Sequence, residues 1–170
     1  MLRALGQRSS SPLTVWWEAG PRDAILAEAT RALPRETGGV LLGWSTATDV
    51  VISHQVGPGA NAEHFRTRFL PDRDWQAEEI ARIYERSGRT IAYLGDWHTH
   101  PGGEPFPSAM DMIALHRIAQ DQEARCPRPV MGILGSDANE YWTAAFHVYN
   151  VRRTFGYARP TAELARLRQA

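Results

Sequence analysis

Four residues in the segment HTHPGGEPFPSAMD (98–111) have types and spacing suited to metal chemistry. His98 and His100 are separated by one residue, so on a β-strand both imidazoles point to the same face. Ser108 and Asp111 are three residues apart, so on a helix they also share a face. Two histidine nitrogens and one carboxylate form a three-ligand set that suits zinc and leaves the fourth position for water. The segment therefore predicts a catalytic metal centre rather than a structural one.

Asp111 also lies on the apolar face of the predicted helix. Leu115 and Ile118 follow it by four and seven residues, which places all three on the stripe that should pack onto a sheet. An isolated buried carboxylate is very costly, and a metal ion shared with the two histidines would be its partner. Hydrolysis also needs a general base. This segment does not supply one, because Glu104 lies in a loop and is expected to be solvated.

The elements that must position these residues follow from hydrophobic periodicity and from turn residues. The strand that ends in the two histidines has an apolar start, which suggests a central place in the sheet. Strands and helices are mixed along the chain, which predicts a single α/β domain with a mixed sheet, of the α+β kind. Strands are expected at 13–20, 36–44, 49–57, 66–71, 90–100, 129–136 and 140–150. Helices are expected from Pro21 to Leu33, from Asp72 to Gly88, from Ser108 to about Arg125, and over 161–170.

Composition excludes several classes of protein. The 170 residues are 43% apolar, which is typical of one globular domain with a single core. Lysines and arginines number 19, as do aspartates and glutamates, and this balance argues against binding to nucleic acid or an acidic membrane. No apolar run approaches the roughly 20 residues of a membrane helix. Residues 1–12 are expected to be a flexible tail without a signal peptide. The single cysteine, Cys126, fits a reducing cytoplasm.

The pattern His98-x-His100-x7-Ser108-x-x-Asp111, with a proline after the second histidine, resembles the signature of the JAMM (MPN+) zinc metalloproteases. That family also has an upstream glutamate near the start of a strand, and Glu36 in ETGGVLLG matches it. The resemblance implies a cytidine-deaminase-like mixed β-sheet flanked by helices. It also implies one Zn²⁺ per chain held by the two histidines and Asp111. Glu36 would carry the proton from the attacking water to the leaving amine, and Ser108 would donate a hydrogen bond to the oxyanion.

The resemblance covers about residues 13–150, so we expect a metalloprotease domain over 13–155 and a C-terminal extension over 156–170. Family members cleave isopeptide or peptide bonds after the C-terminus of ubiquitin or ubiquitin-like proteins. The phrases GDWHTHP and VGPGANAEHFRTRFLPD look like those of bacterial members, which work with ubiquitin-like activating and conjugating enzymes, often in antiphage operons. Further site residues are expected as follows: Asp96 to orient an imidazole N–H, and Gly38, Gly39, His64, Arg66 and Phe106 to contact substrate.

Three alternatives stay open at this point. A zinc nucleoside or base deaminase requires His-x-Glu and Pro-Cys-x-x-Cys motifs, whereas this chain has one cysteine. A non-catalytic MPN scaffold or binding module typically lacks the ligands, which are complete here. A zinc JAMM protein with a role related to nucleic-acid repair is the third, because the loop PGGEPFPS somewhat resembles the loop of such proteins. The zero net charge of the chain argues against binding to DNA. A measurement of metal content would separate a non-catalytic scaffold from an enzyme.

Overall fold

The computed structural model describes residues 13–137, 141–154 and 157–170, and the predicted N-terminal tail lies outside these ranges. The described residues form three helices and ten strands that match most of the expected elements. The helices are α1 (Ala19–Ala32), α2 (Arg73–Arg86) and α3 (Ala109–Gln120). The strands are β1 (Thr14–Trp17), β2 (Gly38–Ser45), β3 (Asp49–Val56), β4 (Glu63–His64), β5 (Phe69–Leu70), β6 (Ala92–His100), β7 (Val130–Ser136), β8 (Trp142–Thr154), β9 (Tyr157–Leu164) and β10 (Arg166–Gln169).

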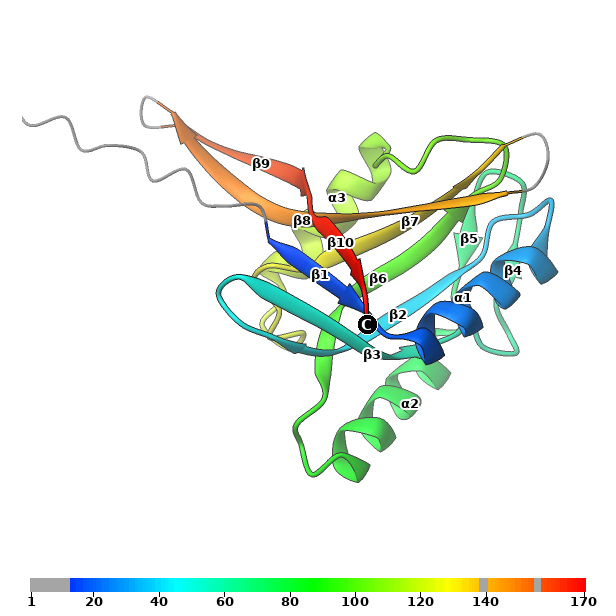
Figure 1. Ribbon diagram of the computed structural model, residues 1–170, viewed down its shortest axis with the longest axis horizontal. Helices are drawn as coiled ribbons and strands as arrows, with labels where there is room; N and C mark the ends of the chain where they lie inside the picture. The colour runs from blue at the N-terminus through cyan, green and yellow to red at the C-terminus, as the bar shows by residue number, and fades with distance from the viewer. Residues whose placement is uncertain (1–12, 138–140, 155–156) are drawn as a thin grey trace, which may run out of the picture.

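Eight of the strands form one mixed sheet, in the order β10-β1-β3-β2-β6-β7-β8-β9 (Figure 1). The pairs β1–β10, β1–β3 and β6–β7 are parallel, and the other pairs are antiparallel. β6, which carries both histidines, lies between β2 and β7 and is therefore central, as its apolar start predicts. The remaining strands, β4 and β5, form a separate two-stranded hairpin. The prediction of a mixed sheet flanked by helices is confirmed.

The C-terminal segment corrects one prediction. A short helix is expected over 161–170, but these residues belong to β9 and β10, which lie at opposite edges of the sheet. Ala165, the single residue between them, donates its N–H to Phe146 O at 2.8 Å, and Arg166 donates to Leu13 O at 2.9 Å. One continuous segment thus pairs with both edges, and the sheet curls to meet it (Figure 1). Helix propensity is a weak preference, and the unpaired backbone groups of two sheet edges override it here.

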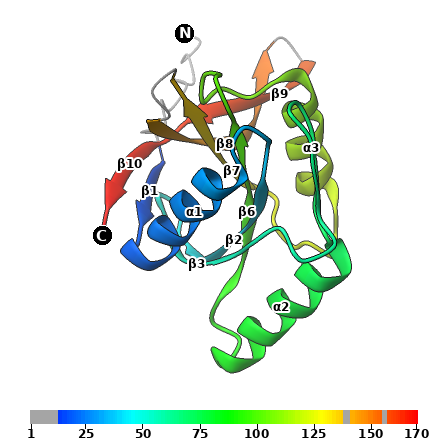
Figure 2. The same cartoon turned by 90° about the vertical axis from the view of Figure 1, so that its right-hand side faces the viewer.

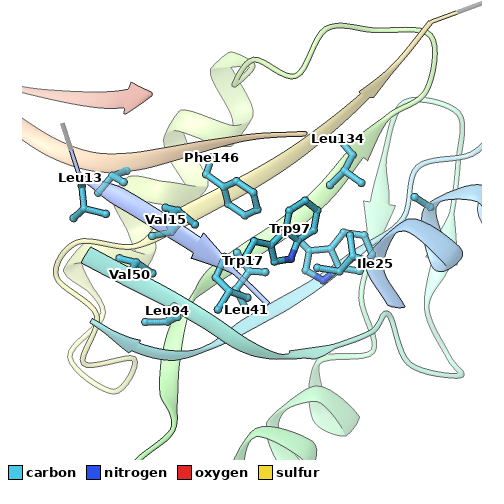
Figure 3. Packing of buried hydrophobic residues seen from close by; sticks show 14 residues of the cluster. Leu13, Val15, Trp17, Ile25, Leu41, Val50, Leu94, Trp97, Leu134 and Phe146 are labelled. Carbon is cyan, nitrogen blue, oxygen red and sulfur yellow. The ribbon is translucent and has the colours of Figure 1, made fainter. Parts of the chain in front are cut away.

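Helices cover both faces of the curled sheet (Figure 2). On one face, Ile25 and Ala29 of α1 join the largest buried cluster, which includes Trp97 and Phe146 (Figure 3). On the other face, α2 packs over β2 and β3, and α3 packs over β7 and β8. Because side chains alternate along β6, the 1% exposed Trp97 enters the first core, whereas His98 points to the side of α2 and α3.

The helix ends differ slightly from the sequence prediction. Asp72 caps α2 as expected, and its carboxylate accepts a hydrogen bond from Trp75 N at 3.3 Å. Ser108 caps α3, but the helix ends at Gln120 rather than near Arg125. Among the helices in the described part of the chain, none combines the length and apolar character needed to cross a membrane.

Candidate active site

The three predicted metal ligands meet where β6 ends and α3 begins. The Nε2 atoms of His98 and His100 are 3.0 Å apart. Asp111 Oδ1 is 3.3 Å from His98 Nε2, and Asp111 Oδ2 is 3.6 Å from His100 Nε2. A tetrahedral zinc ion with bonds of about 2.0–2.1 Å requires donor atoms about 3.3 Å apart. The three donors therefore fit such an ion. Their side chains are 14–19% exposed, so solvent and substrate can reach the centre.

The hydrogen bonds of His100 favour metal binding through Nε2. His100 Nδ1 lies 3.1 Å from the backbone oxygen of Glu104. A carbonyl can only accept a hydrogen bond, so Nδ1 carries the proton, and the neutral ring then has a lone pair on Nε2. An N–H held in this way is the usual support of a metal-binding histidine. Glu104 thus serves the site through its carbonyl, while its side chain is exposed as expected.

The loop that supplies this carbonyl is anchored to the sheet by hydrogen bonds. His147 Nε2 lies 2.9 Å from Pro105 O, and Gly102 N donates to Ser136 Oγ at 2.9 Å. Gly135 allows the close approach, because a Cβ there would lie 2.3 Å from the backbone oxygen of Gly103. Burial lowers the pKa of His147, while its bond to Pro105 opposes the shift, so the ring is favoured in its neutral form. Ser136 and His147 lie far along the chain from the motif, so the spacing of the motif does not reveal these supports.

Asp111 has a second role in the local fold. Its Oδ2 accepts the backbone N–H of Ser108 at 2.7 Å, and Ser108 Oγ accepts the N–H of Asp111 at 3.2 Å. This reciprocal pair is a capping box that fixes the start of α3. Burial opposes ionisation of Asp111, but hydrogen bonds from His100, His98 and Ser108 outweigh it and hold the pKa of Asp111 well below its usual range. Conversely, the nearby Asp111 carboxylate raises the pKa of His100. The Asp111 carboxylate is therefore ionised, and the capping box fixes the direction in which it points.

Glu36 lies next to this group because of the pairing of β2 with β6. Gly38 is opposite His98, and the next residue toward the site, Thr37, exchanges hydrogen bonds with Thr99. Glu36 follows in line with His100. Burial raises the pKa of Glu36, while the nearby charges of His100 and His98 oppose the shift. The glutamate that the motif selected thus shares the electrostatic environment of the three donors.

Thr99 fixes the backbone beside Glu36, although its side chain faces away from the site. Thr37 and Thr99 are both fully buried, and Thr37 N donates to Thr99 Oγ1 at 2.9 Å. The signal that could have indicated this role is a polar residue between the two histidines, on the face of the strand that points into the core.

Thr99→Val should therefore destabilise the protein, because it leaves the buried Thr37 N–H without its partner. We expect a loss of about 1–3 kcal/mol in the free energy of unfolding, measured by urea denaturation. Thr90→Val, at an exposed position where the hydroxyl contacts Ser87 O, should change it by less than about 0.5 kcal/mol. Equal stability of the Thr99 variant and the wild type would contradict this role.

The residues predicted to contact substrate lie in different surroundings. Gly38 and Gly39 are buried inside the sheet, where Cβ atoms would lie 2.5 Å from Trp97 O and 2.0 Å from Val56 O. These glycines pair with β6, whereas the pairing of β2 with β3 begins at Val40, so they serve close strand packing, and their contact with substrate stays a prediction. Phe106 is 58% exposed, and its placement at the rim of the site stays a prediction.

Three other predicted residues have the following surroundings. Asp96 accepts a hydrogen bond from the Tyr93 hydroxyl at 2.8 Å instead of the expected imidazole N–H. Burial raises the pKa of Asp96, and the bond from Tyr93 opposes the shift. His64 Nδ1 lies 2.9 Å from the backbone oxygen of Glu36, which places it in the site by a contact that the sequence does not predict. Arg66 is exposed at the turn of the β4–β5 hairpin, and its contact with substrate stays a prediction.

Comparison with known proteins agrees with this geometry. A family model described as prokaryotic homologs of the JAB domain matches residues 19–150. The chain belongs to this family. The resemblance to JAMM proteins that Glu36, His98, His100, Ser108 and Asp111 indicate is thereby confirmed, and this JAB-domain chain is a JAMM-type hydrolase.

Relatives of this JAB-domain protein have names that describe peptide chemistry. A probable metalloprotease, y4qB of Sinorhizobium fredii, is 42% identical over 125 residues, which cover 72% of this chain and 76% of that protein. A CD-NTase/cGAS isopeptidase of Enterobacter hormaechei is 32% identical and covers 68% of this chain and 63% of that protein. A similar fold is found in the solution structure of protein DSY2949 from Desulfitobacterium hafniense, with a TM-score of 0.65, 19% identity and 92% coverage of each chain.

Proposed function

We propose that this chain is a zinc-dependent isopeptidase or peptidase that cleaves after the C-terminus of a ubiquitin-like protein. The observation that carries the proposal is the convergence of His98, His100 and Asp111 at tetrahedral spacing, with Glu36 in the same electrostatic environment. Relatives named metalloprotease and CD-NTase/cGAS isopeptidase support a peptide or isopeptide bond in a conjugated protein as the substrate. We place the enzyme in a cytoplasmic, bacterial ubiquitin-like conjugation pathway with an antiphage role.

The residues of the site have separate roles in hydrolysis. His98, His100 and Asp111 would hold a zinc ion, which would supply a Lewis acid for the attacking water and the scissile carbonyl. Glu36 accepts a proton from the attacking water and delivers it to the departing amine. Its raised pKa makes it a stronger base than an ordinary glutamate. The Ser108 hydroxyl donates a hydrogen bond to the oxyanion, while a lone pair of the same oxygen accepts the N–H of Asp111.

Exposed apolar side chains on two elements around the site suit an extended C-terminal tail. On the loop before α3 and its first turns, Phe106, Met110 and Ile113 are 58%, 70% and 44% exposed. On the β4–β5 hairpin beside Glu36, Phe65 and Leu70 are each 40% exposed. Successive side chains of an extended tail point in opposite directions, so one tail can contact apolar groups on both elements. Exposed apolar side chains on elements that border a candidate site are consistent with a binding role.

A direct cleavage assay tests the proposal. The zinc-loaded chain is incubated with a ubiquitin-like protein from the same gene neighbourhood, either fused at its C-terminus to a reporter or joined to a lysine side chain. We expect cleavage after the last residue of the ubiquitin-like protein, read by intact mass, and no cleavage by a Glu36→Ala variant. Comparing the two substrates separates precursor maturation from deconjugation. Failure of the wild type on both substrates would contradict the assignment.

Ser108→Ala separates the two roles of that hydroxyl. Loss of the capping oxygen should lower the free energy of unfolding by about 1 kcal/mol, measured by denaturation. Loss of the oxyanion donor should lower kcat by roughly 10²–10³ with a much smaller change in KM. If only the stability changes, Ser108 is a helix cap without a role in catalysis.

A further inference from the structure

The β4–β5 hairpin holds both backbone polar groups of Glu36. The N–H of Glu36 donates to Phe65 O at 2.7 Å, and the backbone oxygen of Glu36 lies 2.9 Å from His64 Nδ1. A carbonyl oxygen can only accept, so His64 Nδ1 carries the proton in this contact. Two adjacent hairpin residues therefore fix the peptide groups on either side of the Glu36 Cα atom. The orientation of these groups sets the direction in which the Glu36 side chain leaves the backbone.

The His64 ring is itself held in place. It is partly buried and packs against Phe69, the cross-strand partner of His64, with ring centroids 5.3 Å apart. Phe69 in turn lies against β2, since a Cβ on Gly38 would be 3.0 Å from Phe69 Cε1. The peptide group after Glu36 is therefore held at two points, at its carbonyl by His64 and at its N–H by the bond from Thr37 N to Thr99 Oγ1. Of the two hairpin contacts with Glu36, the contact with Phe65 is between backbone groups, and the contact with His64 is made by the side chain.

We infer that His64 is a positioning residue for Glu36, acting through its N–H bond to the Glu36 carbonyl and not through contact with substrate. The inference rests on the proposed function, in which Glu36 transfers protons. Without the bond, the peptide group after Glu36 is held only through the bond from Thr37 N to Thr99 Oγ1, and this looser hold lets the carboxylate shift away from the water that it deprotonates. A misplacement of about 1 Å can cost on the order of 10²-fold in rate. Substrate affinity should change little, because the hydrogen bond lies behind the general base.

Two variants separate the N–H of His64 from its ring. His64→Phe keeps a ring against Phe69 and removes the donor, whereas His64→Asn keeps a donor near the position of Nδ1 and removes the ring. We expect His64→Phe to lower kcat by roughly 10- to 10²-fold with KM, zinc content and melting temperature close to wild type. His64→Asn should recover most of the lost kcat. His54→Phe is the matched control, because His54 is an exposed histidine on β3 whose Nδ1 lies 2.9 Å from Ser53 Oγ.

A second measurement needs no substrate. Amide hydrogen exchange over residues 36–38 should be faster in His64→Phe than in the wild type, and near wild type in His64→Asn, because a freed peptide group opens more often. The inference is overturned if His64→Phe raises KM and spares kcat, if it loses zinc together with activity, or if His64→Asn is as impaired as His64→Phe. Unchanged exchange in His64→Phe also overturns it. If the wild type cleaves neither substrate, the proposed function fails, and hydrogen exchange still decides whether His64 positions Glu36.

Discussion

Glu36→Gln should lower kcat by about 10²-fold or more while the protein keeps its zinc and its melting temperature. Glutamine has nearly the same shape as glutamate but cannot accept the proton of the attacking water. Glu36 is not among the three metal donors, so the metal content should not change. The backbone bonds to Phe65 and His64 do not involve the side chain and should survive. The measurement is steady-state cleavage of the reporter fusion, with zinc content determined by mass spectrometry.

Glu63→Gln is the matched control for this prediction, because Glu63 is an exposed carboxylate on the adjacent hairpin. Its kcat should stay within about twofold of the wild-type value, since surface substitutions away from a site have small effects. Near-normal turnover by zinc-loaded Glu36→Gln would remove Glu36 from the mechanism. The proton acceptor would then have to be sought at Glu104 or Asp96.

Asp111→Asn should weaken zinc binding more than any change outside the donor set. Residues that only orient a metal ligand change affinity by about 10- to 100-fold when they are replaced, so loss of the anionic donor itself should cost at least this much. The asparagine oxygen can still accept the N–H of Ser108, so the start of α3 should be retained. Competition with a chromogenic chelator measures the affinity, and circular dichroism checks the helix.

Asp121→Asn controls for the loss of a negative charge on the same helix, because Asp121 is exposed at the C-cap of α3. Its zinc affinity should equal that of the wild type. If Asp111→Asn binds zinc as tightly as the wild type, the third donor must lie elsewhere and the geometry of the proposed centre is wrong.

Most residues of the candidate site could be predicted from the sequence because local rules bring them together. Strand alternation puts His98 and His100 on one face, and helical spacing joins Ser108 to Asp111. The structure adds that the same Ser-x-x-Asp spacing is a capping box, a signal that the sequence already contains. The proximity of Glu36 is a long-range feature. It came from the family motif and is explained by the pairing of Gly38 with His98.

The features that the sequence did not reveal depend on contacts between distant segments. The segment 161–170 has the composition of a helix, but it pairs with β8 and β1 because the sheet curls. Gly38 and Gly39 permit a close approach between neighbouring strands, a role that the sequence pattern alone does not indicate. His64 lies 28 residues beyond Glu36, and no periodicity relates the two. Such contacts can be seen only in the folded chain, because the residues around each partner in the sequence give no sign of the contact.

The central claim is that one metal ion at His98, His100 and Asp111 makes this chain a peptidase. Metal reconstitution tests it most directly. The chain is stripped with a chelator, and cleavage of the ubiquitin-like reporter fusion is measured as Zn²⁺ is added back. We predict no cleavage by the stripped protein and a linear rise in rate that ends at about one equivalent of zinc per chain, the number that one three-donor site can hold. Full cleavage by the metal-free protein, or a rate that does not depend on added metal, would contradict the account.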